Sequence, residues 1–176
     1  MRLSDLGDRI CILGPSNSGK STLAVAIGDK LGIPVVHLDR LYHLPETDWL
    51  PRGAGDFLAL HDAAAAGDRW VMDGSYSITV PQRLRRATGV ILLDVSTLRS
   101  LGRYFRRSLV QTDRHGGLDG GRDSIKWEMI RHIVVTTPGN RRRYAEMFDS
   151  LTLPKIRLAS AAAIRQCYVD WDLRRR

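Results

Sequence analysis

The feature that most constrains this chain is a glycine-rich stretch near its start, Gly14-Pro15-Ser16-Asn17-Ser18-Gly19-Lys20-Ser21. It matches the pattern G-x-x-x-x-G-K-[ST], in which backbone N–H groups surround an anion. A short apolar segment, residues 9–13, precedes it and predicts a buried strand. Apolar residues at helical spacing follow over residues 21–31, and Gly32 is a suitable helix end. Strand, loop and helix in this order predict a site for a nucleoside triphosphate.

The residues of this loop have expected roles in binding ATP and Mg²⁺. Lys20 is expected to reach the β- and γ-phosphates, and the Ser21 hydroxyl to bind Mg²⁺. The N-terminus of the following helix adds a partial positive charge. A turn that matches the pattern by chance is the alternative, and the flanking strand and helix argue against it. The residues expected to contact ATP are Gly14, Pro15, Ser16, Asn17, Ser18, Gly19, Lys20, Ser21 and Thr22.

Strand-like and helix-like segments alternate along the whole chain. This alternation predicts an α/β fold with a parallel sheet covered by helices on both faces. With 176 residues, the chain is expected to form a single domain over residues 1–176. After the first strand we expect further strands at residues 32–39, 69–74, 89–94 and 156–158. Helices are expected at residues 55–66, 97–110 and 123–135, from 137 onward, and at 161–173, the last capped by Ser160. A short helix or a turn is expected at residues 77–86.

Three aspartates stand at the predicted ends of strands: Asp39, Asp73 and Asp94. In open α/β sheets, ligands bind beyond the carboxyl ends of the strands. Carboxylates beside a triphosphate site can bind Mg²⁺ or its water ligands, or can act as a catalytic base. An aspartate that only caps a turn is also common, and this alternative stays open, most of all for Asp94.

The net charge of +8 has two explanations that the sequence leaves open. One is binding of anionic ligands or nucleic acid, and the other is a composition rich in arginine and alanine. Arginines cluster over residues 99–107 and 141–143, which suggests stretches that close over phosphates. No long apolar run predicts a membrane span, and the N-terminal residues do not read as a signal peptide. Cys11 and Cys167 are expected to be small buried residues, so we predict a cytoplasmic protein.

Beyond the loop, several segments resemble a known family. They are His37-Leu38-Asp39-Arg40-Leu41-Tyr42, Trp49, Pro51, the stretch Trp70-Val71-Met72-Asp73-Gly74-Ser75-Tyr76-Ser77, and Arg83-Leu84-Arg85-Arg86-Ala87. Together they resemble adenylate-kinase-related P-loop proteins, and more closely those called DNA topology modulation proteins. The resemblance implies a P-loop NTPase fold with strand order 2-3-1-4-5. It also implies an acceptor-binding flap over about residues 40–68 and an arginine-bearing lid over about residues 107–125.

The resemblance also implies roles for arginines. By position, Arg103 and Arg107 match the two arginines that begin the lid of adenylate-kinase-like enzymes, where one contacts ATP and the other the transferring phosphoryl group. Arginine suits this task because its planar, permanent charge neutralises phosphoryl oxygens. A solvated basic face is the alternative. Arg83 is a candidate for holding the acceptor, although Arg85 or Arg86 would serve equally.

The kind of acceptor is indicated by the positions where the chain departs from true adenylate kinases. Those enzymes have Phe-Pro-Arg after the Asp-Gly pair, whereas here Ser75-Tyr76-Ser77 follows Asp73-Gly74. Asp39 instead resembles an aspartate of shikimate-kinase-like and gluconate-kinase-like enzymes, whose acceptor is a hydroxyl. A carboxylate can orient an alcohol and take its proton. Tyr42 and Trp49 either stack on the acceptor or pack the flap onto the core.

The sequence therefore predicts an ATP- and Mg²⁺-dependent phosphotransferase for a small acceptor: a nucleoside, a nucleotide or a polyol. The alternatives are a nucleic-acid-linked ATPase that modulates DNA topology and a nucleotide-binding regulator without turnover. No membrane partner and no metal besides Mg²⁺ is expected. The predicted catalytic residues are Lys20, Asp39, Arg103 and Arg107, and Arg103 is also predicted to contact ATP. The predicted acceptor-binding residues are Asp39, Tyr42, Asp73 and Arg83, and the predicted metal-binding residues are Ser21, Asp39 and Asp73.

Overall fold

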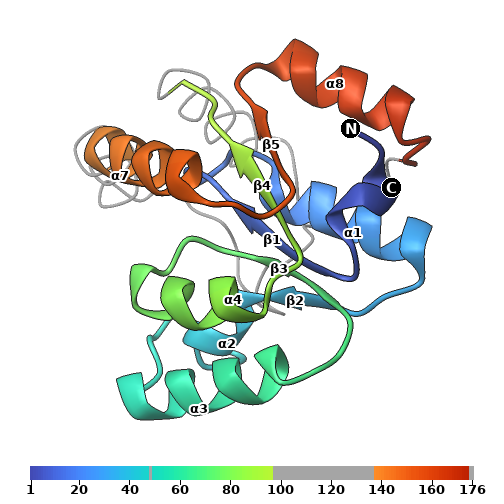
Figure 1. Cartoon of the computed structure of the whole chain (residues 1–176). Helices are drawn as coiled ribbons and strands as arrows, with labels where there is room; N and C mark the ends of the chain where they lie inside the picture. Colours follow the sequence, from blue (N-terminus) through green and yellow to red (C-terminus); the bar gives the residue numbers. More distant parts are fainter. Residues whose placement is uncertain (48, 97–136, 175–176) are drawn as a thin grey trace.

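A five-stranded parallel sheet forms the centre of the computed structural model, which describes residues 1–47, 49–96 and 137–174 (Figure 1). The strand order is β2-β3-β1-β4-β5, and each neighbouring pair is parallel. This confirms the predicted order 2-3-1-4-5. The strands are β1 Arg9–Leu13, β2 Val35–His37, β3 Trp70–Asp73, β4 Gly89–Leu93 and β5 Lys155–Leu158.

Helices cover both faces of the sheet, as the alternating pattern predicted (Figure 1). On one face lie α1 (Lys20–Leu31) and α8 (Ala161–Asp170), and on the other lie α3 (Ala54–Ala65), α4 (Val80–Arg86) and α7 (Thr137–Ser150). The short elements are η1 (Leu3–Leu6), α2 (Leu38–Tyr42) and η2 (Ser77–Thr79). Among the described helices, none has the length and apolar content required to cross a bilayer. The predicted helices at 97–110 and 123–135 and the predicted lid lie outside the described residues.

The central strand β1 separates two apolar clusters. Ile10 and Ile12 belong to the cluster that contains side chains of α1 and α8. Cys11 and Leu13 belong to the cluster that contains side chains of α3, α4 and α7. Because successive strand residues point to opposite faces, a strand covered on both sides must be apolar at every position. This explains the continuous apolar run that precedes the glycine-rich loop.

The second strand is shorter than the sequence predicted, and Asp39 does not end it. β2 pairs with β3 through three residues and stops at His37. Leu38 then turns inward and is fully buried. The space comes from Gly74, where an added Cβ would lie 2.8 Å from the Cβ of Leu38. Asp39 is therefore held in the first turn of α2, beside the sheet edge.

The expectations for the last strand, for the cap of the last helix and for the two cysteines are confirmed. β5 forms over Lys155–Leu158, and the Ser160 hydroxyl accepts a 3.0 Å hydrogen bond from the Ala163 amide at the start of α8. Cys11 and Cys167 are both buried free thiols. Burial raises the pKa of Cys11 to about 11 and that of Cys167 to about 12, so both thiols are neutral. They serve as small core residues.

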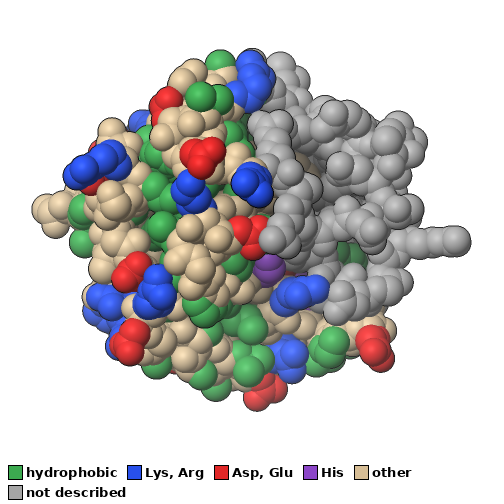
Figure 2. All heavy atoms as spheres, turned by 90° about the vertical axis from the view of Figure 1, so that its right-hand side faces the viewer, with side chains coloured by type: hydrophobic (Ala, Val, Ile, Leu, Met, Phe, Trp, Pro, Cys, Tyr) green, Lys and Arg blue, Asp and Glu red, His purple; other side chains and the backbone are tan. Residues whose placement is uncertain are grey.

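Acidic and basic side chains are mixed on the surface. On the face shown in Figure 2, the described Lys and Arg side chains lie among Asp and Glu side chains and form no continuous basic patch. Local pairs include Lys30 with Asp172 at 2.7 Å and Arg142 with Glu146 at 2.8 Å. Such exposed pairs contribute little to stability, because water screens them well. On this face, the described side chains give no sign of a nucleic-acid surface.

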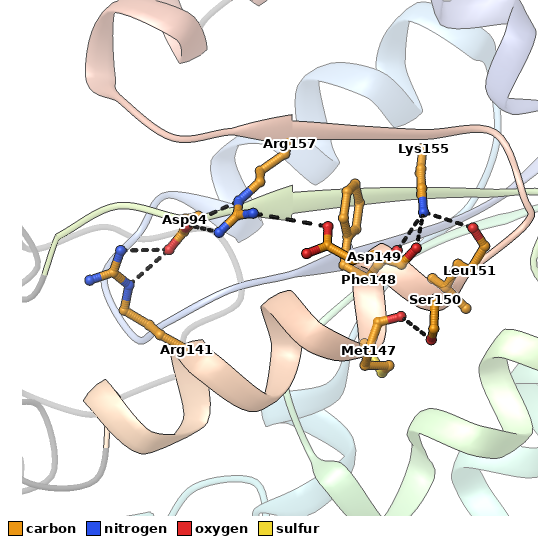
Figure 3. Close-up of polar contacts among 9 residues, drawn as sticks. All are labelled: Asp94, Arg141, Met147, Phe148, Asp149, Ser150, Leu151, Lys155 and Arg157. Carbon is orange, nitrogen blue, oxygen red and sulfur yellow. Dashed lines mark hydrogen bonds and ion pairs between the residues drawn. The ribbon is translucent and has the colours of Figure 1, made fainter.

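Helix α7 is tied to the edge of the sheet near both of its ends (Figure 3). Arg141 donates two hydrogen bonds, of 2.8 and 2.6 Å, to Oδ1 of Asp94, the residue after β4. Arg157 of β5 donates two more, of 3.1 and 2.6 Å, to Oδ2. At the other end, Lys155 Nζ donates to the carbonyls of Phe148, Asp149 and Leu151. Both oxygens of Asp94 are thus engaged by arginine, which favours the structural alternative that the sequence left open for this aspartate.

We expect Asp94→Asn to destabilise the protein by about 1–2 kcal/mol, since both arginines lose a charged acceptor but remain partly hydrated. Burial by itself would raise the pKa of Asp94, but hydrogen bonds from Arg157 and Arg141 and their charges lower it. A carboxyl with a lowered pKa contributes stability above its unfolded value, about 3.9, and that contribution disappears as the pH falls through the folded value. Denaturant unfolding at pH 7 and at pH 3 should therefore show a smaller deficit of the variant at pH 3. An equal deficit at both pH values would contradict the assignment.

Candidate functional site

The glycine-rich loop has a backbone that only certain residues can adopt. Gly14 has φ +145°, and an added Cβ would lie 2.4 Å from the carbonyl oxygen of Leu93. Gly19 has φ +98° and caps the N-terminus of α1. Asn17, at φ +60°, is a residue type that tolerates this left-handed region. The loop therefore leads directly into a helix N-terminus, where unpaired N–H groups attract an anion.

Lys20 lies folded back over this loop. Its Nζ donates a 2.8 Å hydrogen bond to the carbonyl oxygen of Pro15. Burial lowers the pKa of Lys20, while the nearby charges of Asp39 and Asp73 act in the opposite direction. An ammonium group that donates to one neutral carbonyl can exchange this hydrogen bond for stronger ones to phosphate oxygens.

Asp73, the last residue of β3, is buried and bonded on both sides. Its Oδ2 accepts a 2.6 Å hydrogen bond from the Ser21 hydroxyl. Its Oδ1 lies 2.5 Å from Nδ1 of His37. The register of the sheet accounts for this second contact, since His37 and Asp73 are partners in the β2–β3 pairing. A hydroxyl and a carboxylate are the hard oxygen donors that Mg²⁺ prefers, so this pair beside the glycine-rich loop fits the ion.

Asp39 makes a hydrogen bond with a partner other than those of Asp73. Its Oδ1 accepts a 2.7 Å hydrogen bond from the hydroxyl of Tyr76. Burial, and then the charge of Asp39, raise the pKa of Tyr76 far above its usual range. The phenol therefore stays protonated and remains a donor. Of the two predicted carboxylates, the structure joins Asp73 to Ser21 and joins Asp39 to Tyr76.

Ser75 connects the glycine-rich loop to the turn after β3. Its hydroxyl accepts a 3.1 Å hydrogen bond from the Gly14 amide and donates a 2.7 Å hydrogen bond to the Gly14 carbonyl. The carbonyl of Ser75 accepts a hydrogen bond from the hydroxyl of Tyr144 on α7. The first glycine of the loop is therefore fixed from two directions, by Ser75 and by the approach of β4.

Arg83, predicted to hold the acceptor, lies behind the same turn. Its side chain is buried, with 1% of the residue exposed, and Nη1 donates a 3.0 Å hydrogen bond to the carbonyl of Gly74. Its Nε and Nη2 have no hydrogen-bond partner among the described residues. Burial lowers the pKa of Arg83, opposed by Cys11, Tyr144 and Asp73. In the structure, Arg83 supports the backbone of the turn from behind.

Aromatic rings pack together in the flap beside Asp39. The ring of Tyr42 lies 4.7 Å from Tyr76 and 5.1 Å from Phe57, measured between centroids. It also lies 4.8 Å from His43, which is 5.0 Å from Trp49. These contacts are close to the distances that aromatic pairs favour. The contacts of Tyr42 with Tyr76 and Phe57 fit the packing role expected for it, whereas the contact of Trp49 with His43 lies within the flap. Stacking on an acceptor stays a prediction for both residues.

The structure brings together the loop residues, Lys20, Ser21, Asp73 and Asp39, and places Tyr42 and Arg83 nearby through Tyr76 and Gly74. Arg103 and Arg107 lie outside the described residues. Four residues of this region were missed as functional residues from the sequence: His37, Ser75, Tyr76 and Tyr144. A signal existed for Ser75 and Tyr76, because they occupy the segment where the chain departs from the adenylate-kinase pattern.

Comparison with known proteins extends this description at the level of the fold. No protein-family model matches the sequence, and no curated protein matches it. Solved structures do match. Shikimate kinase from Acinetobacter baumannii in complex with shikimate has a TM-score of 0.52 and 18% identity, over 94% of this chain and 93% of that one.

Two further solved structures have the same arrangement. Deoxyadenosine kinase from M. mycoides, with dCMP and dCDP bound, has a TM-score of 0.52 and 16% identity over 96% of both chains. An unliganded sugar kinase from Janibacter sp. HTCC2649 has a TM-score of 0.51 and 16% identity, over 93% of this chain and 94% of that one. At this identity the likeness shows the fold alone, and the fold is that of the P-loop kinases.

Proposed function

We propose that the protein is an ATP- and Mg²⁺-dependent phosphotransferase that phosphorylates a hydroxyl group of a small molecule. The observation that supports this most is that the two carboxylates have different hydrogen-bond partners. Asp73 is bonded to Ser21 beside the glycine-rich loop, whereas Asp39 is bonded to Tyr76 and is available on the side of the flap. Phosphoryl transfer to an alcohol requires both a metal-side carboxylate and a proton acceptor for the alcohol.

On the nucleotide side, the loop would bind the phosphates through its backbone amides and the N-terminus of α1. Lys20 would exchange the carbonyl of Pro15 for oxygens of the β- and γ-phosphates. Ser21 and Asp73 would hold Mg²⁺, which neutralises charge on the phosphates when it is bound. The contact between Asp73 and His37 would keep Oδ2 directed at the metal side.

On the acceptor side, Asp39 would accept the proton of the attacking hydroxyl. Tyr42 would form part of the wall of the acceptor site, next to Tyr76. Arg103 and Arg107 are proposed to clamp the transferring phosphoryl group, following their position in the sequence. Arg83 would act by fixing the Gly74 carbonyl, and so the turn that carries Ser75 and Tyr76.

The names of the structural neighbours agree with a hydroxyl acceptor. Shikimate, sugars and deoxyadenosine, which appear in those names, all carry hydroxyl groups. An adenylate-kinase-like transfer to a nucleotide phosphate is the less favoured form of the same activity. Of the arginines predicted to hold an acceptor, Arg83 is buried against Gly74, whereas Arg85 and Arg86 are exposed.

The test is an acceptor screen that measures ADP release. Nucleosides, deoxynucleosides, nucleotides, sugars and polyhydroxy acids should be supplied with Mg-ATP, and we expect at least one hydroxyl acceptor to raise turnover well above basal hydrolysis. Phosphorylated product should appear in equal amount to ADP. If no acceptor raises turnover while the protein still binds Mg-ATP, the phosphotransferase proposal is wrong.

The same screen covers the alternative functions. DNA and RNA should be included because the net charge of the chain is +8. Stimulation of ATP hydrolysis by a polymer, with a steep decrease as salt is raised, would support the nucleic-acid-linked ATPase. Binding of ATP with no turnover under any of these conditions would support a nucleotide-binding regulator.

A further inference from the structure

We propose that Tyr76 is the positioning residue of the acceptor site: it holds one oxygen of Asp39 and thereby presents the other to the acceptor hydroxyl. This inference rests on the proposed phosphotransferase function. It adds to that function a residue that the sequence motifs did not identify. It also specifies which oxygen of Asp39 is occupied and which is available.

The hydroxyl of Tyr76 is held firmly in place. The backbone carbonyl of Tyr76 accepts hydrogen bonds of 3.0 Å from both the amide and the hydroxyl of Thr79. The ring packs against Tyr42 at 4.7 Å and Phe57 at 5.2 Å. Since both ends of the residue are fixed, the phenol can hold the carboxylate of Asp39 in one orientation.

The carboxylate is half fixed and half available. The backbone of Asp39 lies in α2, where its carbonyl accepts hydrogen bonds from the amide and from Nδ1 of His43. The side chain accepts from Tyr76 through Oδ1 at 2.7 Å. Its Oδ2 has no hydrogen-bond partner within the described part of the chain. Because the carboxylate group is planar, fixing Oδ1 also fixes the direction in which Oδ2 accepts a hydrogen bond.

In the proposed reaction, the carboxylate of Asp39 and the hydroxyl of Tyr76 have different tasks. As the acceptor oxygen bonds to the γ-phosphorus, the bond from that phosphorus to the β,γ-bridging oxygen breaks, and ADP leaves with the electron pair. The proton of the acceptor hydroxyl moves to Oδ2 of Asp39 and later to solvent. Tyr76 cannot compete for this proton, because its own hydroxyl proton remains in place as the donor to Oδ1.

The first test is Tyr76→Phe, assayed with the hydroxyl acceptor that the screen identifies. We expect kcat to fall about 10- to 100-fold, as for loss of a hydrogen bond to a charged group, with affinity for Mg-ATP changed less than about twofold. Ser77→Ala is the matched control. It removes the hydroxyl of the next residue, which is exposed and donates to no described residue, so kcat should be unchanged.

The second test asks whether Tyr76 acts through Asp39. In an Asp39→Asn background, adding Tyr76→Phe should cause no further loss of turnover, because the carboxylate to be positioned is already gone. Melting temperatures should be measured for the native protein, the two single variants and the double variant. The two substitutions should shift the melting temperature non-additively, which establishes the contact without any acceptor. Turnover and melting temperature can both be measured even if Tyr76→Phe is less stable than the native protein.

The outcomes separate the inference from the function on which it rests. If the native protein phosphorylates an acceptor and Tyr76→Phe keeps its kcat, the inference is overturned and the function stands. Strictly additive effects on turnover and on melting temperature would also overturn it. If the native protein phosphorylates no acceptor, both are overturned together.

Discussion

Replacing Lys20 with alanine should reduce affinity for Mg-ATP at least 100-fold and remove measurable turnover. Lys20 is the loop residue whose charge would meet the β- and γ-phosphates, and each lost hydrogen bond between charged groups costs about 1.5–3 kcal/mol. The fold should survive, because the side chain of Lys20 makes only one hydrogen bond to the described residues, to the Pro15 carbonyl. Calorimetric titration with a non-hydrolysable Mg-ATP analogue measures the affinity directly.

Lys30→Ala is the matched control for this variant. Lys30 lies at the other end of the same helix and pairs with Asp172, with 41% and 89% of the two side chains exposed. An ion pair this exposed contributes little to stability, so neither the affinity for Mg-ATP nor the melting temperature should change appreciably. If Lys20→Ala binds the analogue as tightly as Lys30→Ala does, the loop is not a phosphate site.

The second large effect concerns the two carboxylates, whose replacement should change different kinetic quantities. Asp39→Asn should lower kcat by about 100- to 10,000-fold, the usual contribution of a general base, while affinity for Mg-ATP stays the same. Asp73→Asn should instead raise the Mg²⁺ concentration needed for half-maximal activity by about 10- to 100-fold. The reason is their contacts, since Asp73 is bonded to Ser21 and Asp39 to Tyr76.

Steady-state kinetics over a range of Mg²⁺ concentrations distinguishes the two variants. Asp56→Asn is the control, because it makes the same change at an exposed position in the first turn of α3. A common effect of Asp39→Asn and Asp73→Asn on Mg²⁺ dependence would mean that both carboxylates bind the metal, as the sequence also allowed. An unchanged kcat for Asp39→Asn would remove the general base from the proposal.

Much of the fold could be predicted because it is recorded locally in the sequence. The apolar run over residues 9–13 precedes the glycine-rich loop, and strand-like and helix-like segments alternate along the rest of the chain. The order of the strands was not a local property, and it came from the resemblance to P-loop proteins. The sheet and the structural neighbours confirm that order, while the narrower resemblance to DNA topology modulation proteins stays a hypothesis.

The contacts of the site were less predictable, because they join residues far apart in the chain. Pairing of His37 with Asp73 requires the register of β2 on β3, which no sequence motif states. The hydrogen bond from Tyr76 to Asp39 depends on a helical turn where the sequence predicted strand. That turn follows from the burial of Leu38 against Gly74, a packing detail beyond the reach of periodicity.

Four consecutive residues, from the last residue of β3 onward, each contact a different part of the molecule. Asp73 bonds to Ser21 and Gly74 to Arg83 of α4. Ser75 bonds to Gly14 and to Tyr144 of α7, and Tyr76 bonds to Asp39 beside the flap. A single inserted or deleted residue here would shift every later side chain onto the wrong partner. Evolution of this segment is therefore restricted in length even where it is free in composition. In distant relatives with the same chemistry, the spacing between the strand and the tyrosine should persist after most of the surrounding sequence has diverged.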